Sequence, residues 1–223
     1  MSEKAFLDTC VFIAFAFHIN SLHSLSHIVI NSYNECYWSD FVKSEYNNRF
    51  KEKLNNLSKF IRDLNIELVN PTKEFYSPQD LFNFVLRRYS RKLQVDAQSS
   101  IEPFWEEYMG MVSQIPFYIL NKKLNLCLID LSSHAQFNNN FLENNILLTP
   151  QRIKNYDTIE SMLKSEGVKE EDRHVALDCH DFAKNQNDLV DFVTFDETLY
   201  HCVINIERHS CNSIKGKYDF ILS

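Results

Sequence analysis

Four acidic residues that lie far apart in the chain each stand beside a short apolar stretch: Asp8, Glu45, Asp172 and Asp196. A carboxylate that follows a buried strand lies where open α/β sheets bind their ligands, in the crevice outside the carboxyl ends of the strands. Carboxylates gathered there repel one another unless a cation joins them, and Mg²⁺ or Mn²⁺ is the cation that oxygen ligands favour. The four acids therefore predict a divalent-metal site suited to phosphodiester hydrolysis.

Asp8 and Asp196 give the strongest signal, because each ends an apolar, strand-like run, Ala5–Asp8 and Phe192–Asp196. Each could instead be the N-cap of the helix that follows, since N-cap positions also favour Asp. Two such residues in one chain favour a metal site that they share over two separate N-caps, because parallel strands bring their carboxyl ends to the same edge of a sheet.

Glu45 and Asp172 are expected on helices, where acids also have ordinary roles. Glu45 follows a strand-like segment by about one turn, and Asp172 ends the run Glu170–Asp172, which the helix dipole would favour in a first turn. Glu171 replaces Asp172 if the helix register is shifted by one residue. Asp178 is six positions on, about 240° around the helix, so it is expected to support the site indirectly. Asp181 is expected at the surface.

Composition excludes several other classes of protein. The chain has 223 residues, 44% of them hydrophobic, which is enough for a sizeable core. Three glycines cannot build a glycine-rich phosphate loop, and six cysteines without a C-x-x-C pair do not support a zinc ribbon. The cysteines favour a reducing, cytoplasmic setting, and no apolar run is long enough to cross a membrane.

The formal net charge of -7 means that the overall field does not attract nucleic acid, so any such binding must use local basic patches. Two patches are candidates. One is the run Arg87–Lys92, and the other lies near Glu45 and consists of Lys43, Arg49, Lys51 and Lys53. Most charge runs on helices are simply solvated faces.

Strands that alternate with helices at both ends of the chain predict a mostly parallel sheet with helices on both faces. The expected strands are Lys4–Asp8, Cys36–Trp38, Val190–Thr194 and Cys202–Ile206. The expected helices begin near Val11, Ser21, Asp40, Thr158, Asp172 and Asp196, and Gly167 is expected to end the one that begins at Thr158.

The middle of the chain lacks this alternation. Residues 72–150 are expected to form a helical insertion within a single domain that spans residues 1–223. A helix is expected over Phe104–Ile119. The asparagine content of Asn121–Asn145 is typical of loops or reflects the base composition of the genome, and it favours neither a repeat nor a low-complexity function.

As an ordered set, the acidic motifs resemble those of the PIN-domain family of ribonucleases. In that family a first-strand Asp, a Glu on an early helix, an Asp that opens a late helix and an Asp in a Thr-x-Asp motif share one metal site. The matching segments here are Leu7–Thr9, Ser44–Glu45, Asp172–Ala176 and Thr194–Asp196, and the resemblance covers roughly residues 3–69 and 150–210.

The resemblance implies a three-layer α/β fold and Mg²⁺- or Mn²⁺-dependent cleavage of RNA. Asp8 and Asp196 would bind the metal directly, and Glu45 and Asp172 would complete the site directly or through water. A non-catalytic PIN-like module that binds RNA or a protein remains an alternative, as does the toxin of a toxin–antitoxin pair, with an antitoxin as partner. The oligomeric state, a homodimer included, stays open. A dehalogenase-like phosphatase is excluded, because it would need an Asp where Cys10 stands.

Overall fold

The computed structural model describes residues 3–67, 77, 79–80, 83, 105–106, 117–186, 189–204, 213–216 and 219–220. The chain forms two compact units. The first comprises Met1–Ala16, Leu22–Arg49 and Asn138–Ser223, and the second comprises Phe17–Ser21 and Phe50–Phe137. Much of the expected insertion and the whole basic run Arg87–Lys92 lie outside the described residues.

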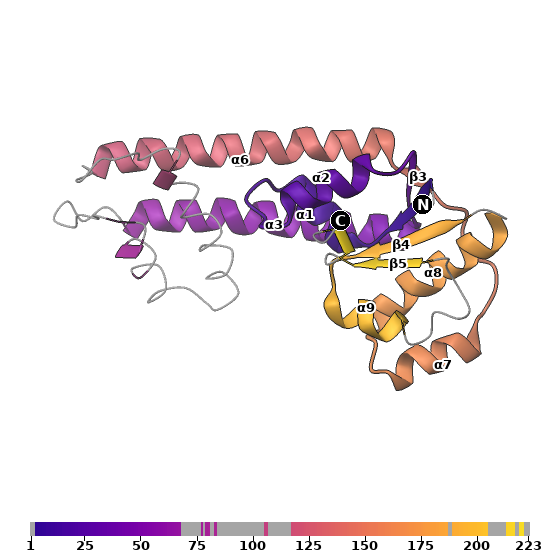
Figure 1. Cartoon of the computed structure of the whole chain (residues 1–223). Helices are drawn as coiled ribbons and strands as arrows, with labels where there is room; N and C mark the ends of the chain where they lie inside the picture. Colours follow the sequence, from indigo (N-terminus) through magenta and orange to yellow (C-terminus); the bar gives the residue numbers. More distant parts are fainter. Residues whose placement is uncertain are drawn as a thin grey trace. The chain divides into compact units, whose positions relative to one another are not determined.

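The first unit contains a five-stranded sheet in which every strand runs parallel to its neighbours (Figure 1). The strand order is β3-β2-β1-β4-β5. The strands are β1 Lys4–Leu7, β2 Glu35–Trp38, β3 Leu147–Leu148, β4 Val190–Thr194 and β5 Ser213–Gly216. The parallel α/β class predicted from the sequence is therefore confirmed.

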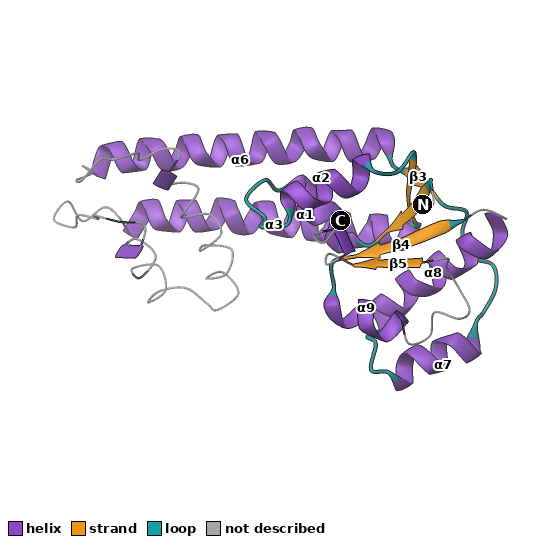
Figure 2. Ribbon diagram, viewed as in Figure 1, coloured by secondary structure: helices purple, strands orange, loops and turns teal. Residues whose placement is uncertain are grey.

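Helices flank this sheet, α1 and α2 on one face and α8 and α9 on the other, which gives a three-layer arrangement (Figure 2). The described helices of the chain are α1 Thr9–Ala16, α2 His23–Asn31, α3 Asp40–Glu67, α6 Phe117–Asn145, α7 Asp157–Ser165, α8 Glu170–Gln186 and α9 Glu197–Ile204. The predicted helix starts near Val11, Ser21, Asp40, Thr158, Asp172 and Asp196 are confirmed to within a few residues.

The central strands β1 and β4 are buried on both faces. Ala5, Phe6 and Leu7 are inaccessible to solvent, and every residue of β4 is buried. The ring of Phe6 packs between Phe182 of α8 and Phe192 of β4, with centroid distances of 6.4 and 6.2 Å. Strands covered on both faces are apolar at nearly every position, which is why these two could be recognised in the sequence.

The expectation of a loop over Asn121–Asn145 is wrong, because this segment belongs to α6. Its asparagines bond to helical backbone in place of turning the chain: Asn144 Nδ2 donates to the Asn140 carbonyl at 2.8 Å, and Asn145 Nδ2 to that of Phe141 at 2.7 Å. Leu142 is fully buried, so packing of an apolar face outweighs the weak helix propensity of asparagine.

The expected strand Cys202–Ile206 is also wrong, because α9 continues through Ile204 and the last strand comes later, at β5. Leu199 and Val203 are the buried residues of α9 and lie four positions apart, on one face of the helix. A short apolar run does not distinguish a strand from a buried helix end by its periodicity.

Gly167 ends α7 as predicted, with φ of 82°. Its N–H donates to the Lys164 carbonyl at 3.1 Å, and the N–H of Val168 donates to the Leu163 carbonyl at 3.0 Å. Leu163 and Val168 are both buried. These two bonds and the apolar pair form a Schellman motif, which needs a residue in the left-handed region.

We predict that Gly167→Ala lowers the free energy of unfolding by about 1 kcal/mol. There is open space around the added Cβ, so the cost comes from the left-handed backbone alone. Urea unfolding measures the difference, with Glu166→Ala at the preceding exposed position as control. An unchanged midpoint for Gly167→Ala would contradict the motif.

Candidate metal centre at the carboxyl ends of β1 and β4

The ends of β1 and β4 form the topological switch point of the sheet. The chain leaves β1 toward β2 and β3 on one side, then crosses over and continues through β4 and β5 on the other. Such switch points are where open α/β sheets bind ligands. Leu7 pairs with Val193, and the Asp8 N–H donates to the Val193 carbonyl at 3.0 Å, so Asp8 begins where both strands end.

Thr194 connects Asp8 with Asp196. Its buried hydroxyl donates to Asp8 Oδ2 at 2.7 Å and accepts from the Asp196 N–H at 3.0 Å. The Cys10 thiol donates to the same Asp8 oxygen at 3.0 Å. Burial raises the pKa of Asp8, the donors Cys10 and Thr194 lower it, and the negative charge of Glu45 raises it. Two donors thus hold the Asp8 carboxylate in a buried position, and this burial disfavours its charged form.

Thr9, next to Asp8, holds Glu45. The Thr9 hydroxyl donates to Glu45 Oε2 at 2.6 Å, and Arg49, one turn further along α3, pairs with Oε1 at 2.5 Å. Because Thr9 is buried, it fixes one oxygen of Glu45 near the end of β1.

Asp172 lies in the first turn of α8 and has its pKa raised to about 6. Partial burial is the main cause. The negative charges of Asp8 and Asp196 add to it, the positive charge of Lys169 opposes it, and Glu45 adds a smaller effect. All four acids singled out in the sequence belong to the first unit, and the charges of the other three influence the pKa of Asp172. The neighbouring Glu171 is exposed.

The N-cap interpretation also holds for Asp196. Its Oδ1 accepts the N–H of Leu199 at 2.9 Å, which satisfies an amide in the first turn of α9. The cap uses one carboxylate oxygen of an exposed residue. In α1 the equivalent Val11 N–H donates to the backbone carbonyl of Asp8 at 3.0 Å, while the Asp8 carboxylate accepts from Cys10 and Thr194.

Asp178 has a different environment from Asp172. It pairs with Arg152, Nε to Oδ1 at 3.2 Å, and accepts a hydrogen bond from Ser39.

The expectation that Asp181 lies at the surface is wrong: Asp181 is 5% exposed and accepts a hydrogen bond from the Tyr156 hydroxyl at 2.7 Å. Its position on the buried face of α8 follows from helical spacing with the buried Leu177. Arg152 gave no signal in the sequence, because it follows a two-residue strand.

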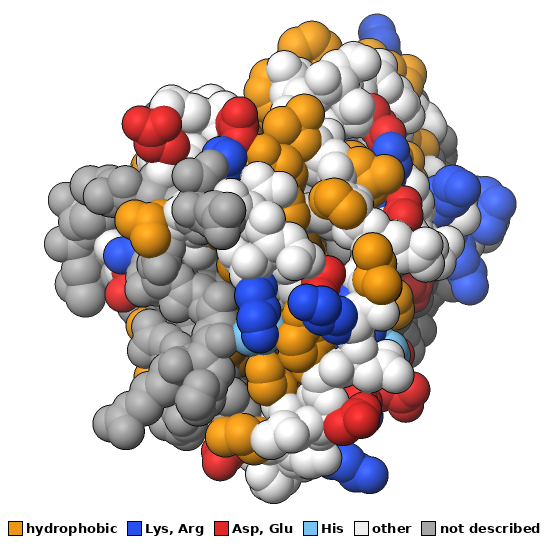
Figure 3. Space-filling view, turned by 90° about the vertical axis from the view of Figure 1, so that its right-hand side faces the viewer, with side chains coloured by type: hydrophobic (Ala, Val, Ile, Leu, Met, Phe, Trp, Pro, Cys, Tyr) orange, Lys and Arg blue, Asp and Glu red, His pale blue; other side chains and the backbone are white. Residues whose placement is uncertain are grey.

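Two of the four basic residues near Glu45 are engaged in ion pairs. Lys43 pairs with Glu143 at 2.7 Å, and Arg49 pairs with Glu45. On the described part of the face shown in Figure 3, side chains of both signs are interspersed. This arrangement agrees with a chain of net negative charge that does not attract nucleic acid by its overall field.

The donor set suits a hard divalent cation. All four groups are carboxylates, and the pKa values of Asp8 and Asp172 are raised partly by the charges of the other acids, which a cation would offset. Within the described ranges, no three His, Cys, Asp or Glu side chains already stand as a group that could hold a metal ion. The acids are therefore neighbours whose side chains would have to converge on binding.

Comparisons of the chain with protein-family models, with curated proteins and with solved structures found no match. Among the described helices, none is long and apolar enough to cross a membrane.

We predict that Thr194→Val lowers the free energy of unfolding by about 2 kcal/mol at pH 7, because Asp8 loses a buried donor and the Asp196 N–H loses its acceptor. The deficit should shrink in acid, where Asp8 is protonated and needs the donor less. Thr194→Ser keeps the hydroxyl, so its deficit should not depend on pH. Chemical unfolding at pH 4 and pH 7 measures both, and equal pH dependence in the two variants would contradict the assigned hydrogen bond.

We also predict that Asp172→Asn stabilises the metal-free protein. The folded-state pKa of about 6 lies above the ordinary value of 3.8, so ionisation of Asp172 disfavours the fold as pH rises from about 4 to about 6. After discounting for solvent screening, the gain at pH 7 should be about 1 kcal/mol, and it should vanish below pH 4.

Unfolding in EDTA at both pH values tests the effect of Asp172→Asn. The matched control is Glu171→Gln, which removes a neighbouring first-turn acid at an exposed position. A gain of the same size in the control, or a gain at pH 4, would show that the effect does not come from the neighbouring acids.

Proposed function

We propose that this chain is a metal-dependent endoribonuclease of PIN-like architecture, with Mg²⁺ or Mn²⁺ bound by Asp8, Asp196, Glu45 and Asp172. The observation that carries the proposal is the hydrogen bonding at the strand ends, where Thr194 joins Asp8 to the Asp196 backbone and Thr9, next to Asp8, holds Glu45. The negative charges of Asp8, Asp196 and Glu45 also contribute to the raised pKa of Asp172, which supports including Asp172 in the same site.

The position of these acids supports the same conclusion. Asp8 follows β1 at the switch point of the parallel three-layer fold, and the other acids come from α3, α8 and the β4–α9 turn, in the order that the PIN-domain resemblance requires. The choice of RNA as substrate rests on that resemblance.

The roles of the residues follow from their contacts. Asp8 and Asp196, joined through Thr194, would hold the cation, and Glu45 and Asp172 would complete its site. Thr9 holds one oxygen of Glu45, and the Cys10 and Thr194 donors hold one oxygen of Asp8. Each carboxylate would still have to turn toward the cation on binding. When bound, the cation would activate a water for attack on phosphorus and stabilise the charge that develops on the phosphate.

We predict that the purified protein cleaves a labelled, partly structured RNA in Mn²⁺ or Mg²⁺ and that EDTA abolishes the cleavage. Asp8→Asn should lower the rate by at least about 100-fold, since loss of one group that stabilises transition-state charge costs on this order. Gel analysis of the products measures the rate. Glu171→Gln, an exposed acid outside the site, is the matched control and should cleave like the wild type.

A second readout separates metal binding from catalysis. Mn²⁺ should raise the unfolding temperature of the wild type and of Glu171→Gln but have a much smaller effect on Asp8→Asn. Intact RNA together with a Mn²⁺ effect equal in all three proteins would contradict the proposal. That result would favour the non-catalytic alternative, in which the chain binds RNA or a protein partner.

A further inference from the structure

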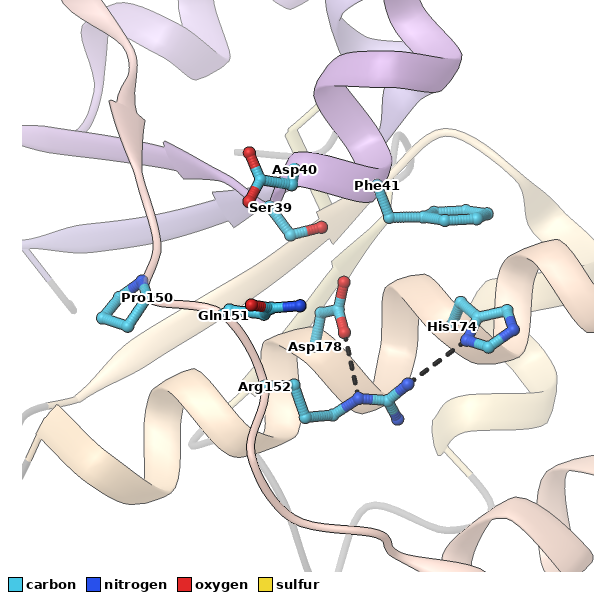
Figure 4. Close-up of a pocket in the computed structure, with 8 residues that line it drawn as sticks. All are labelled: Ser39, Asp40, Phe41, Pro150, Gln151, Arg152, His174 and Asp178. Atoms are coloured by element: carbon cyan, nitrogen blue, oxygen red, sulfur yellow. Dashed lines mark hydrogen bonds and ion pairs between the residues drawn. The ribbon is translucent and has the colours of Figure 1, made fainter.

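A cavity of about 330 Å³ lies beside the candidate metal centre, within the first unit (Figure 4). Three segments form its walls: the junction between β2 and α3, the loop that follows β3, and α8. Its lining residues are Ser39, Asp40, Phe41, Pro150, Gln151, Arg152, His174 and Asp178. The volume is within the range of pockets that bind small organic groups.

The charge of the cavity does not suit an anion. The guanidinium of Arg152 is already paired with Asp178, and its Nη2 lies 3.2 Å from His174 Nδ1. Asp40 adds a second carboxylate, so the lining contains two acids and one arginine. A phosphate or carboxylate would meet net repulsion there, whereas a neutral ligand with its own donors and acceptors would not.

The walls contain planar side chains and one amide side chain. Phe41 lies against His174, with ring centroids 5.3 Å apart, and the planar Arg152 guanidinium lies beside the imidazole. Gln151 extends from the opposite loop toward them in Figure 4, and its amide can both donate and accept. Aromatic rings and guanidinium planes on which a base stacks, with side chains that reach its edge, are how proteins recognise unpaired nucleotides.

The cavity also lies at a suitable position along α3. Phe41 precedes Glu45 by four residues, so the two residues are on the same face of the helix and about 6 Å apart along its axis. Glu45 is in turn bonded to Thr9, next to Asp8. A nucleotide bound at Phe41 would therefore place its backbone near the four acids.

We propose that this cavity binds one unpaired nucleobase of the substrate and so selects the nucleotide next to the cleaved bond. The position beside a cleaved bond rests on the proposed ribonuclease function, whereas the recognition of a base rests on the cavity itself.

Nucleoside binding tests the cavity without catalysis. The probes are adenosine, guanosine, cytidine and uridine, titrated in EDTA into the Asp8→Asn protein, with ¹⁵N chemical shifts as the readout. At least one nucleoside should bind, and Phe41→Leu and Gln151→Ala in the same background should each weaken binding at least fivefold. Inorganic phosphate should not compete. Ile153→Ala, at a neighbouring exposed position outside the lining, should have no effect.

Two results would overturn the proposal: no shift with any nucleoside, or binding that is unchanged in both Phe41→Leu and Gln151→Ala. Because Gln151 is exposed, its substitution keeps the test informative if Phe41→Leu affects folding. In proteins with intact acids, short RNAs that differ at one base should be cleaved with a preference that Gln151→Ala reduces at least fivefold.

The two proposals can fail separately. Nucleoside binding that depends on Gln151, without RNA cleavage by the wild type, would overturn the ribonuclease function and support the base site. Metal-dependent cleavage without such binding would overturn the base site alone.

Discussion

The parallel pairing of β1 with β4 is the constraint on which the candidate site depends. These strands come from opposite ends of the chain, and their register places Leu7 opposite Val193. Asp8 and Thr194 then meet without any further folding of loops, and the Thr194 hydroxyl joins the Asp8 carboxylate to the Asp196 backbone. A shift of the register by one residue would turn Thr194 to the other face and separate the two acids.

The sequence was most informative where burial is most complete. Ala5–Leu7 and most of Val190–Thr194 are apolar because both faces of the central strands are covered, so the acids that follow these strands stood out. The outer strands gave no such signal. β3 has two residues, both exposed. β5 follows α9, and the apolar end of α9 was interpreted as the last strand instead. In α6, tertiary packing decided the conformation against the local preference of its asparagines.

The contrast between buried central strands and exposed outer segments also explains which parts of the site could be predicted from the sequence. Asp8 and Asp196 are positioned by the strands, and Glu45 and Asp172 by the first two turns of helices that begin at recognisable signals. The cavity lined by Arg152, Gln151 and Phe41 depends instead on the loop after β3, whose path is set by pairing with β2. Short-range sequence patterns contain no information on a contact of that kind.

The electrostatics of the site also oppose the stability of the metal-free fold. Burial and like charges raise the pKa of Asp8 and Asp172, so in the absence of a cation each acid is harder to ionise than an exposed one. Donors from Thr9, Cys10 and Thr194 hold the carboxylates in place at this cost instead of letting them turn to solvent. Since the three donors are supplied by residues directly beside the strand ends, the fold holds these oxygens near one another without a cation, and a bound cation would offset the repulsion between the carboxylates.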